Sequence, residues 1–338
     1  MADTTTTAAM ASFSRAVTHP QRRVRVHQTC WRLYRVKPGR RFWHPCSRPV
    51  PLRRSHLDHL RKKRYVAAEK TDGVRMSLVF GRYSDNTPFS VLLDVLGNSH
   101  EVQVYAPEPF FEGSLFDGEL VMQRDTGLWT LFIFNLVAIA NHSWVEENFI
   151  TRYQKIHEIF PGAESVTNRH IATEKRKEMA MAGMVVPAPP TSNKNGPGRR
   201  RGEEDWVAPL CIVAKTMFPM EMLGILVRSS KNLSHESDGF VLTPVDEPVR
   251  VGVHRRCFKK KHFPTIDIEV SANTNGELHL WCADYHEKVK LDDAFPRMKF
   301  SLVDNGRCSL LPGTSVIIEC FVDRAESGQE KSYVFTFH

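Results

Sequence analysis

Glu69-Lys70-Thr71-Asp72-Gly73-Val74-Arg75 is the stretch that most narrows the fold of this 338-residue sequence. The preceding residues, Tyr65 to Glu69, have the composition of a strand, and Asp72-Gly73 is typical of a tight turn. The motif therefore lies where a strand enters a turn. By itself Lys-x-Asp-Gly is a weak signal, because any turn can contain Asp-Gly.

Three further motifs strengthen this signal. A second Asp-Gly occurs in Asp117-Gly118-Glu119, and a third in Ser237-Asp238-Gly239-Phe240-Val241-Leu242-Thr243-Pro244. The basic stretch Phe258-Lys259-Lys260-Lys261 follows. On a strand, Lys259 and Lys261 would point to one face and Lys260 to the other.

These residue types together predict a site for an anionic nucleotide and a covalent lysine step. A lysine is nucleophilic only as the neutral amine, and nearby cations and desolvation lower its pKa. Arg75, Lys259 and Lys261 could supply those cations, neutralise a triphosphate and stabilise charge developing at its α-phosphate. Carboxylates such as Glu119 and Asp238 can hold ribose hydroxyls, or Mg²⁺ through water. The sequence contains no Gly-x-x-x-x-Gly-Lys-Ser/Thr loop, so a P-loop enzyme is excluded.

The order of these motifs resembles the covalent nucleotidyltransferases, which comprise ATP-dependent DNA ligases, RNA ligases and GTP-dependent capping enzymes. Within that superfamily, 69–75 and 258–267 are similar to the capping version, and the resemblance covers about residues 48 to 323. It implies an α+β fold. A ligase-type, ATP-grasp-like nucleotidyltransferase domain of antiparallel sheets and helices would precede a C-terminal OB-fold β-barrel. Five short strand-like runs after residue 263 also favour a small barrel.

For the phosphate end of the site, the resemblance implies roles for four residues. Lys70 would attack the α-phosphate of GTP, release pyrophosphate and form lysyl-GMP, from which GMP passes to the 5′-diphosphate end of RNA. Lys259 and Lys261 would contact the phosphates. Asp238 would lie beside the metal, Mg²⁺ or Mn²⁺, as its tentative ligand.

For the nucleoside end, the resemblance implies that Arg75 and Glu119 contact the ribose. Phe134 corresponds to the aromatic residue that stacks on guanine, and Lys215 to a lysine near the guanine edge. Asn135 departs from the pattern, because the family usually has Asp after the stacking residue. Asn keeps the size and one acceptor but loses the charge.

With the resemblance, the sequence divides into three parts: 1–47, a basic and partly disordered extension; 48–262, which the resemblance implies is the nucleotidyltransferase domain; and 263–338, which it implies is the OB-fold domain. Within the second part, 171–205 is rich in Pro, Gly and Arg and predicts a flexible insertion. Residues 1 to about 20 show no pattern and are predicted to be disordered.

Charge is unevenly placed along the chain. Residues 1–64 hold 16 Lys and Arg against two acidic residues, whereas the remainder holds 30 against 36. Attraction for nucleic acid should therefore concentrate in the N-terminal part. The alternative is a basic tail that only aids solubility.

The sequence ends at His338, where the resemblance would continue with an Arg-x-Asp-Lys-type motif that contacts the β- and γ-phosphates. The OB-fold domain is therefore expected to be incomplete, and a chain ending here is expected to form lysyl-GMP weakly.

Three functions follow from the sequence: an mRNA guanylyltransferase, a polynucleotide ligase using ATP, or a catalytically impaired relative that binds RNA or a partner through its basic N-terminal segment. Thr71 and the pair Thr243-Pro244 favour capping. The expected partners are GTP, 5′-diphosphate RNA, and a separate RNA triphosphatase and cap methyltransferase, since no Cys-x5-Arg phosphatase loop is present. No apolar run reaches the roughly 18 residues of a membrane span. The expected location is the nucleus for a cellular protein, or a viral or host-cell compartment for a viral one.

Overall fold

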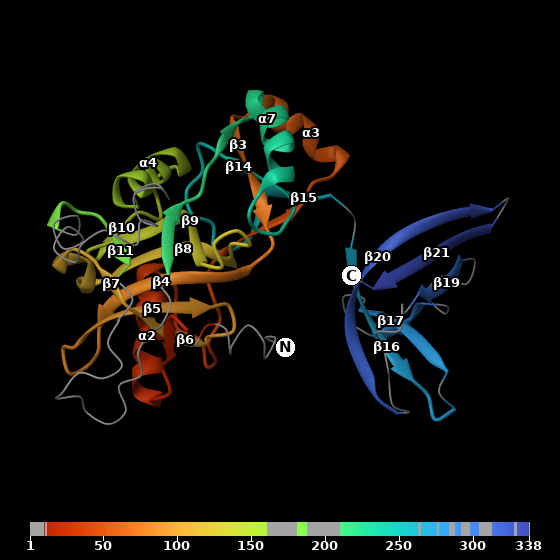
Figure 1. Cartoon of the computed structure of the whole chain (residues 1–338), viewed down its shortest axis with the longest axis horizontal. Helices are drawn as coiled ribbons and strands as arrows, with labels where there is room; N and C mark the ends of the chain where they lie inside the picture. Colours follow the sequence, from red (N-terminus) through yellow and green to blue (C-terminus); the bar gives the residue numbers. More distant parts are fainter. Residues whose placement is uncertain are drawn as a thin grey trace. The chain divides into compact units, whose positions relative to one another are not determined.

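The computed structural model describes residues 10, 12–160, 181–187, 210–262, 265–275, 277–283, 288–291, 298–303, 313–327 and 330–337. The chain forms two compact units, Met1–Lys260 and Lys261–His338. Both are built mainly from strands, with helices added to the first unit (Figure 1). The fold is therefore mixed α/β with sheets predominating, as the sequence predicted.

The larger sheet of the first unit has eight strands in the order β1-β6-β5-β4-β8-β9-β10, with β12 pairing in parallel with β9. The strands between β6 and β10 on this path are antiparallel, so consecutive hairpins build most of the sheet. Their bounds are β1 Ser14–Ala16, β4 Val74–Arg82, β5 Pro88–Asp94, β6 Ser99–Val102, β8 Ser114–Met122, β9 Trp129–Ile139, β10 His142–Ser143 and β12 Cys211–Ala214.

A second sheet of the first unit has the order β13-β3-β14-β15-β2. Its strands are β13 Phe218–Pro219, β3 Tyr65–Thr71, β14 Ser237–Pro244, β15 Gly252–Lys261 and β2 Ser47–Pro51. The predicted turn at Asp72-Gly73 joins β3 of this sheet to β4 of the larger one. A Cβ atom at Gly73 would lie 2.6 Å from the Leu120 carbonyl oxygen, so the close approach of β8 explains the glycine.

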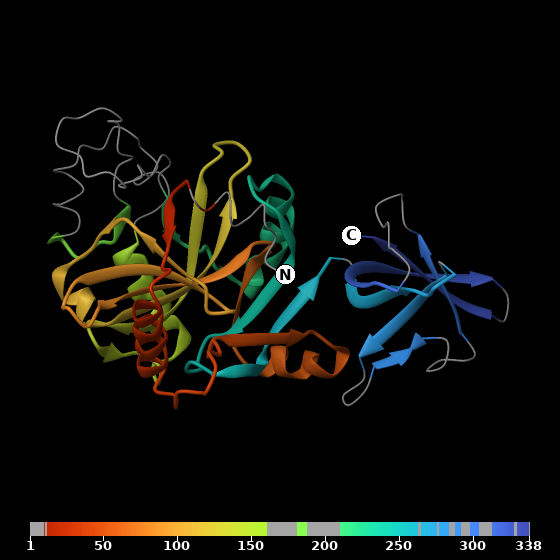
Figure 2. The same cartoon turned by 90° about the horizontal axis from the view of Figure 1, so that it is seen from below.

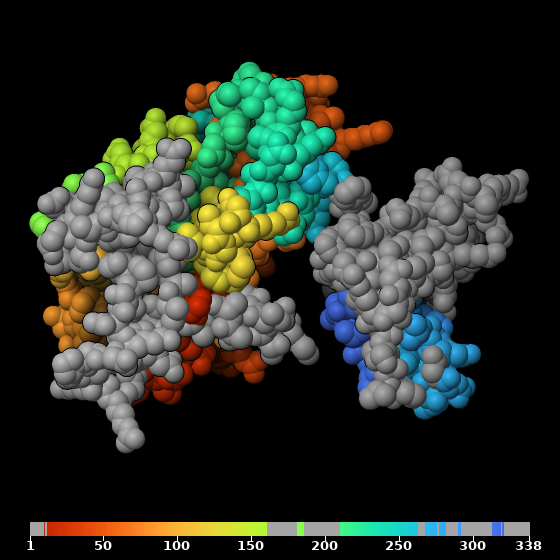
Figure 3. Space-filling view, viewed as in Figure 1, coloured from red at the N-terminus to blue at the C-terminus, as the bar shows by residue number. Residues whose placement is uncertain are grey.

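The two sheets are also connected at the turn between β8 and β9. There the Arg124 amide donates a hydrogen bond to the Ser234 carbonyl, just before β14. Figure 3 shows this yellow turn on the surface beside the green region of α7. The two sheets are therefore connected at two places, the β3–β4 turn and the hydrogen bond from Arg124 to Ser234.

Helices and short elements complete the first unit. Asn148 caps α4 by accepting a hydrogen bond from the Thr151 amide, and the helix buries its apolar face on β9. The helices are α2 Pro20–Leu33, α3 Leu57–Lys62, α4 Phe149–Ile159 and α7 Leu223–Ser229, with 3₁₀ turns η1 Arg54–His56, η2 Glu108–Glu112, η3 Met220–Met222 and η4 Ser230–Asn232, and a short pair β7 Val104–Tyr105 with β11 Val186–Pro187.

The hydrophobic core covers both faces of the larger sheet. Leu78, Phe80 and Phe116 point into one cluster, while their neighbours Val79 and Leu115 point into the other. Such alternation follows from the two-residue period of a strand. Because both faces are buried, these strands carry apolar residues on both of their faces.

Within the extension predicted over 1–47, residues 12–20 were expected to be disordered but contain β1, while residues 1–9 and 11 lie outside the described residues. β1 pairs with β6, and α2 buries Val26, Cys30 and Leu33 in the second core cluster. Figure 1 places α2 against the larger sheet. The spacing of these three residues is helical, but the four arginines of this helix conceal it in the sequence. A three-residue strand such as β1 carries no pattern at all.

The second unit is one six-stranded sheet in the order β18-β17-β16-β20-β21-β19. Its strands are β16 Thr265–Ala272, β17 Leu278–Ala283, β18 Lys288–Lys290, β19 Met298–Val303, β20 Ser315–Ser327 and β21 Glu330–Phe337. All five predicted runs are strands, and β19 was missed. The predicted barrel is not confirmed, because β18 and β19, the two end strands of the path, do not pair with each other within the described residues.

Two other expectations concern regions that the structure describes only in part. The predicted insertion over 171–205 lies outside the described residues except for 181–187, where β11 is found. In the described part of the chain, no helix is both long and apolar enough to span a membrane.

Candidate functional site

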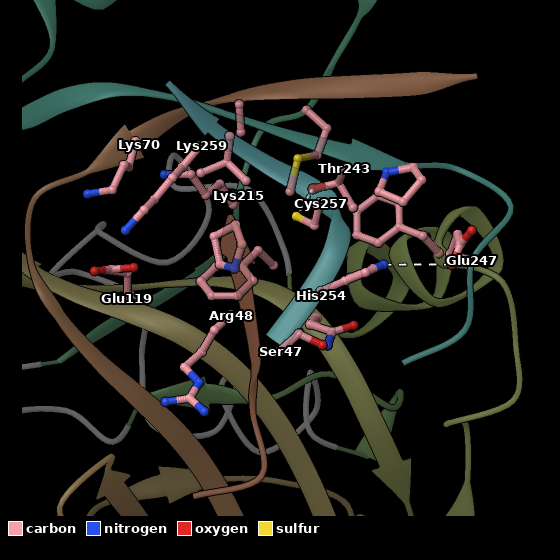
Figure 4. Close-up of a pocket in the computed structure, with 18 of the residues that line it drawn as sticks. Ser47, Arg48, Lys70, Glu119, Lys215, Thr243, Glu247, His254, Cys257 and Lys259 are labelled. Atoms are coloured by element: carbon pink, nitrogen blue, oxygen red, sulfur yellow. Dashed lines mark hydrogen bonds and ion pairs between the residues drawn. The ribbon is translucent and has the colours of Figure 1, made fainter. Parts of the chain in front are cut away.

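A cavity of about 340 Å³ lies between the two sheets of the first unit. This is within the usual size range of small-molecule sites. Figure 4 shows Lys70, Lys259 and Lys215 along one side, Glu119 facing them, and Arg48 and Ser47 below. Six of the predicted site residues line it: Lys70, Arg75, Glu119, Phe134, Lys215 and Lys259.

Lys70 lies near the end of β3 and donates hydrogen bonds from Nζ to both carboxylate oxygens of Asp238, each at 2.8 Å. Asp238 occupies a bulge of β14, where the register shifts between Ser237 and Gly239. A bulge re-aims a side chain, and here it brings the carboxylate to the lysine. The two side chains are 22% and 19% exposed, and of the two it is Lys70 that lines the cavity, whereas Asp238 is not among the described lining residues.

Beside Lys70, a buried polar network surrounds Glu69. Its carboxylate pairs with Lys215, accepts a hydrogen bond from Thr71 at 3.2 Å, and lies 2.9 Å from Nε2 of His235. Lys215 also donates to the Thr71 hydroxyl. Burial alone would raise the pKa of Glu69, but the partners His235 and Lys215 lower it. Burial lowers the pKa of Lys215, although Glu69 opposes that shift.

The position of Lys215 follows from the sheet. It comes directly after β12, and its amide donates to the Ile133 carbonyl of β9 at 2.7 Å. The residue is only 5% exposed, which excludes a solvated surface lysine. Its ammonium lies 5.1 Å from the centre of the Phe132 ring. The lysine is therefore held rigidly against the wall of the cavity.

On the opposite sheet, Arg75 forms a two-point ion pair with Asp117, with contacts of 2.5 and 3.2 Å. Asp117 is fully buried. Burial alone would lower the pKa of Arg75, but the adjacent Asp117 raises it. The guanidinium also lies 5.2 Å from the centre of the Phe134 ring, within range of a cation–π interaction. Arg75 thus links the buried core to the aromatic surface of the cavity.

Phe134 of β9 and Val241 of β14 both line the cavity, one from each sheet. An aromatic ring facing an aliphatic side chain across a gap between sheets is suited to a planar, apolar ligand group. Next along β9, Asn135 accepts a hydrogen bond from Arg152 of α4 at 3.1 Å. The Asn135 side-chain oxygen therefore serves as the acceptor for Arg152, at the position where the family usually has Asp.

Glu119 is the carboxylate that faces the lysines in Figure 4. Desolvation raises its pKa to about 7, although Arg75, Lys215 and Lys70 oppose the shift. A carboxyl group of this kind changes charge near neutral pH, and a cation bound beside it would favour its ionised form.

The two predicted phosphate-facing lysines differ in the structure. Lys259 lines the cavity and Lys260 is exposed, as alternation along β15 predicted. Lys261, the last residue of β15, is not among the described residues that line the cavity. Its predicted phosphate contact stays a prediction.

Sequence reasoning missed Glu69, His235 and Asp117 as contributors to this site. Glu69 was quoted only as part of the motif, although it directly precedes the lysine. His235 stands three residues before Asp238, and nothing in its neighbours marks it. Asp117 belongs to the second Asp-Gly motif, but its burial beneath Arg75 depends on the pairing of β4 with β8.

Comparison with known families identifies the class of this protein. A model described as "mRNA capping enzyme, catalytic domain" matches residues 14–184, half of the chain. The chain belongs to the mRNA capping enzyme family, and its catalytic domain is that of a nucleotidyltransferase. Membership implies nucleotide and RNA substrates. The match begins at β1, in agreement with the incorporation of residues 14–47 into the first unit.

Solved structures with some similarity are DNA ligases. A mycobacterial DNA ligase D complexed with ATP and MES has a TM-score of 0.40 and 11% identity, over 86% of this chain and 93% of that chain. The ligase domain of LigD from M. tuberculosis has a TM-score of 0.37 and 10% identity, over 87% and 92%. At these values the similarities carry no argument about function.

Proposed function

We propose that this protein is an mRNA guanylyltransferase, which transfers GMP from GTP through lysyl-GMP to the 5′-diphosphate end of RNA. The observation that carries this proposal is that the Lys70 amine, the Lys259 ammonium and the Phe134 ring line one cavity. A nucleophile, a phosphate partner and a base platform are the three elements that nucleotidyl transfer to a lysine requires.

In the first step, the neutral amine of Lys70 attacks the α-phosphorus of GTP. The N–P bond forms, the bond to the bridging oxygen breaks, and pyrophosphate leaves with that electron pair. Asp238 holds Lys70 by two hydrogen bonds and is placed to accept the proton that the nitrogen loses. Lys259 supplies a fixed positive charge for the phosphates as their charge is redistributed.

In the second step, a terminal oxygen of the RNA 5′-diphosphate attacks the phosphorus of lysyl-GMP. The N–P bond breaks and its electron pair returns to Lys70, which regains a proton. Asp238 can return that proton across the same hydrogen bonds.

For the base, Phe134 would stack on guanine with Val241 on its other side. The network around Glu69 holds the Lys215 ammonium and the Thr71 hydroxyl together, so both can meet the polar edge of the ring. Arg75 and Glu119 remain the candidates for the ribose.

The carboxylates fit a divalent metal, although no group of three or more His, Cys, Asp or Glu side chains in the described part of the chain forms a metal site. Mg²⁺ commonly uses one or two carboxylates, with substrate phosphates and water as the other ligands. Asp238 and Glu119 would hold Mg²⁺ or Mn²⁺. When bound, the metal neutralises phosphate charge.

Labelling with radioactive GTP and Mg²⁺ tests the proposal. Wild type should carry label that survives denaturation and is released in acid, as expected of a phosphoramidate. Lys70→Ala should reduce labelling at least about 1000-fold. Lys260→Ala is the matched control, because this exposed lysine lies outside the cavity. Retention of label by Lys70→Ala would refute the assignment, and label from ATP instead of GTP would indicate a ligase.

The wider setting is also a proposal. An RNA triphosphatase and a cap methyltransferase would act before and after this enzyme, in the nucleus or in a viral or host-cell compartment. An OB-type barrel over 263–338 belongs to the same proposal. RNA binding without covalent GMP would favour the catalytically impaired relative instead.

A further inference from the structure

The loop between α2 and β2 carries an outward-facing group of Lys37, Arg40, Arg41 and Trp43, which we name the loop platform. All four residues are exposed, and Trp43 is 39% exposed. We propose that the loop platform binds the single-stranded 5′ segment of the RNA substrate. This inference rests on the proposed function, and it adds a binding surface outside the nucleotide cavity.

The loop holds a defined position because Phe42 points inward. Its ring stacks on His27 of α2 at 4.2 Å between centroids and on Trp31 at 5.5 Å. The Trp31 indole nitrogen donates to the Trp43 carbonyl at 2.9 Å. Gly97 lies so close to the Phe42 ring that a Cβ atom there would be 2.7 Å away. Since Phe42 is anchored, the next residue in this extended segment, Trp43, is directed outward.

The Trp43 ring itself rests on the backbone of the loop. A Cβ atom at Gly39 would lie 2.9 Å from Cδ1 of Trp43, so the glycine allows the ring to pack closely. Within the described residues, the indole N–H makes no hydrogen bond. A supported ring with one accessible side and a free N–H suits stacking by a base, with which aromatic side chains bind single-stranded nucleic acid.

The positive charges of the loop platform are not neutralised by neighbouring side chains. Among the described residues, Lys37, Arg40 and Arg41 form no ion pair, whereas Arg64 pairs with Asp246 at 2.6 Å. The carboxylate of Asp94, in the turn next to Gly97, already accepts hydrogen bonds from the amides of Leu96 and Asn98. Free cations beside an exposed ring fit the alternating phosphates and bases of a single strand.

The loop platform leads directly to the cavity. His44 contacts Ser77 of β4 at 3.1 Å, and the chain then enters β2, where Ser47 and Arg48 line the cavity. Figure 2 shows this red-to-orange segment running from α2 to β2, and Figure 4 shows Arg48 at the cavity. Trp43 and Arg48 are five Cα-to-Cα steps apart, a reach of at most about 18 Å. An RNA with its 5′ end in the cavity can therefore cross Arg48 and reach the loop platform.

Binding of a 5′-diphosphate RNA of about 16 nucleotides, followed by fluorescence anisotropy over a salt series, tests the proposal. The double variant Arg40→Gln/Arg41→Gln should reduce the slope of log K against log salt by about 1.4, the value for two single-strand phosphates. Trp43→Ala should weaken binding about tenfold, and Trp43→Phe should restore most of it. Arg228→Gln/Lys231→Gln removes two exposed charges from α7 and η4, which form no ion pair among the described residues, and is the matched control.

Activity separates the loop platform from the catalytic site. Lysyl-GMP formation from GTP should be unchanged in the loop variants, which also shows that they are folded. The KM of GMP transfer should rise for the long RNA and stay constant for a diphosphate-ended dinucleotide. Unchanged RNA affinity and salt slope in the loop variants would overturn the proposal. If wild type formed no lysyl-GMP, the proposed function would fail, and the binding series would still decide the loop platform.

Discussion

Two carboxylate–cation pairs bridge neighbouring strands on the two sides of the cavity, and they differ in burial. Arg75 and Asp117 join β4 to β8, with Asp117 fully buried. Lys70 and Asp238 join β3 to β14, and each side chain is about one-fifth exposed. The chemical groups are similar and both cations line the cavity, but the carboxylate of the first pair is closed to solvent, whereas that of the second is partly exposed.

The difference separates a structural pair from a reactive one. Breaking a buried pair leaves an uncompensated charge in a low-dielectric interior, so Arg75 and Asp117 are held together throughout. A partly exposed pair loses much less when its partners separate, because water screens both charges. Separation of Lys70 from Asp238, which the proposed attack on a phosphate requires, should therefore cost the fold little.

The largest expected effect is on stability. Asp117→Ala should lower the free energy of unfolding by about 3–5 kcal/mol, since it leaves Arg75 partly buried without its partner. Urea denaturation measures the change. Asp246→Ala is the control, because it removes an exposed pair with Arg64 and should cost at most about 1 kcal/mol. Equal losses of unfolding free energy in Asp117→Ala and Asp246→Ala would show that the buried pair contributes no more to stability than an exposed one.

A smaller effect is expected at the reactive pair, and it should appear in activity. Asp238→Asn should slow lysyl-GMP formation about 100-fold by removing the proton acceptor, while stability changes by at most about 1 kcal/mol. The measurement is the single-turnover rate of labelling with GTP beside a urea titration. Glu236→Gln, an exposed neighbour paired with Arg124, should leave the rate unchanged. A large stability loss without a rate effect would make Asp238 structural.

The smallest effect concerns Glu119, which lies between the two pairs. Burial raises its folded pKa to about 7 from an ordinary value of 4.5. Its contribution to stability is therefore complete below pH 4.5 and is lost as the pH rises through 7. Glu119→Gln should gain about 2.5 kcal/mol of stability relative to wild type between pH 5 and pH 8, slightly less than the free-energy equivalent of a roughly 100-fold rate change. Urea titrations at several pH values measure this, and parallel curves for the two proteins would contradict it.

Local signals identified much of the fold and the centre of the site. Features that depend on residues close in sequence could be predicted. They include the strands around Lys70, the turn at Asp72-Gly73, and the alternation of Lys259 with Lys260. The five strand-like runs after residue 263 are confirmed as strands for the same reason. The barrel could not be settled in this way, because closure depends on pairing between distant strands.

By itself, therefore, the sequence identified the family and the order of the motifs and predicted Lys70 as the nucleophile, since each is carried by a few adjacent residues with one chemical purpose. Only the tertiary structure decided that His235 and Lys215 meet at Glu69. It also decided that Asp117 is buried under Arg75, and that Phe42 anchors on α2 while Trp43 faces solvent. These contacts join residues far apart in the chain or depend on which face of a strand or loop is covered. Residue propensity and motif spacing predict neither the distant contacts nor the covered faces, because burial is a property of the assembled sheets and helices.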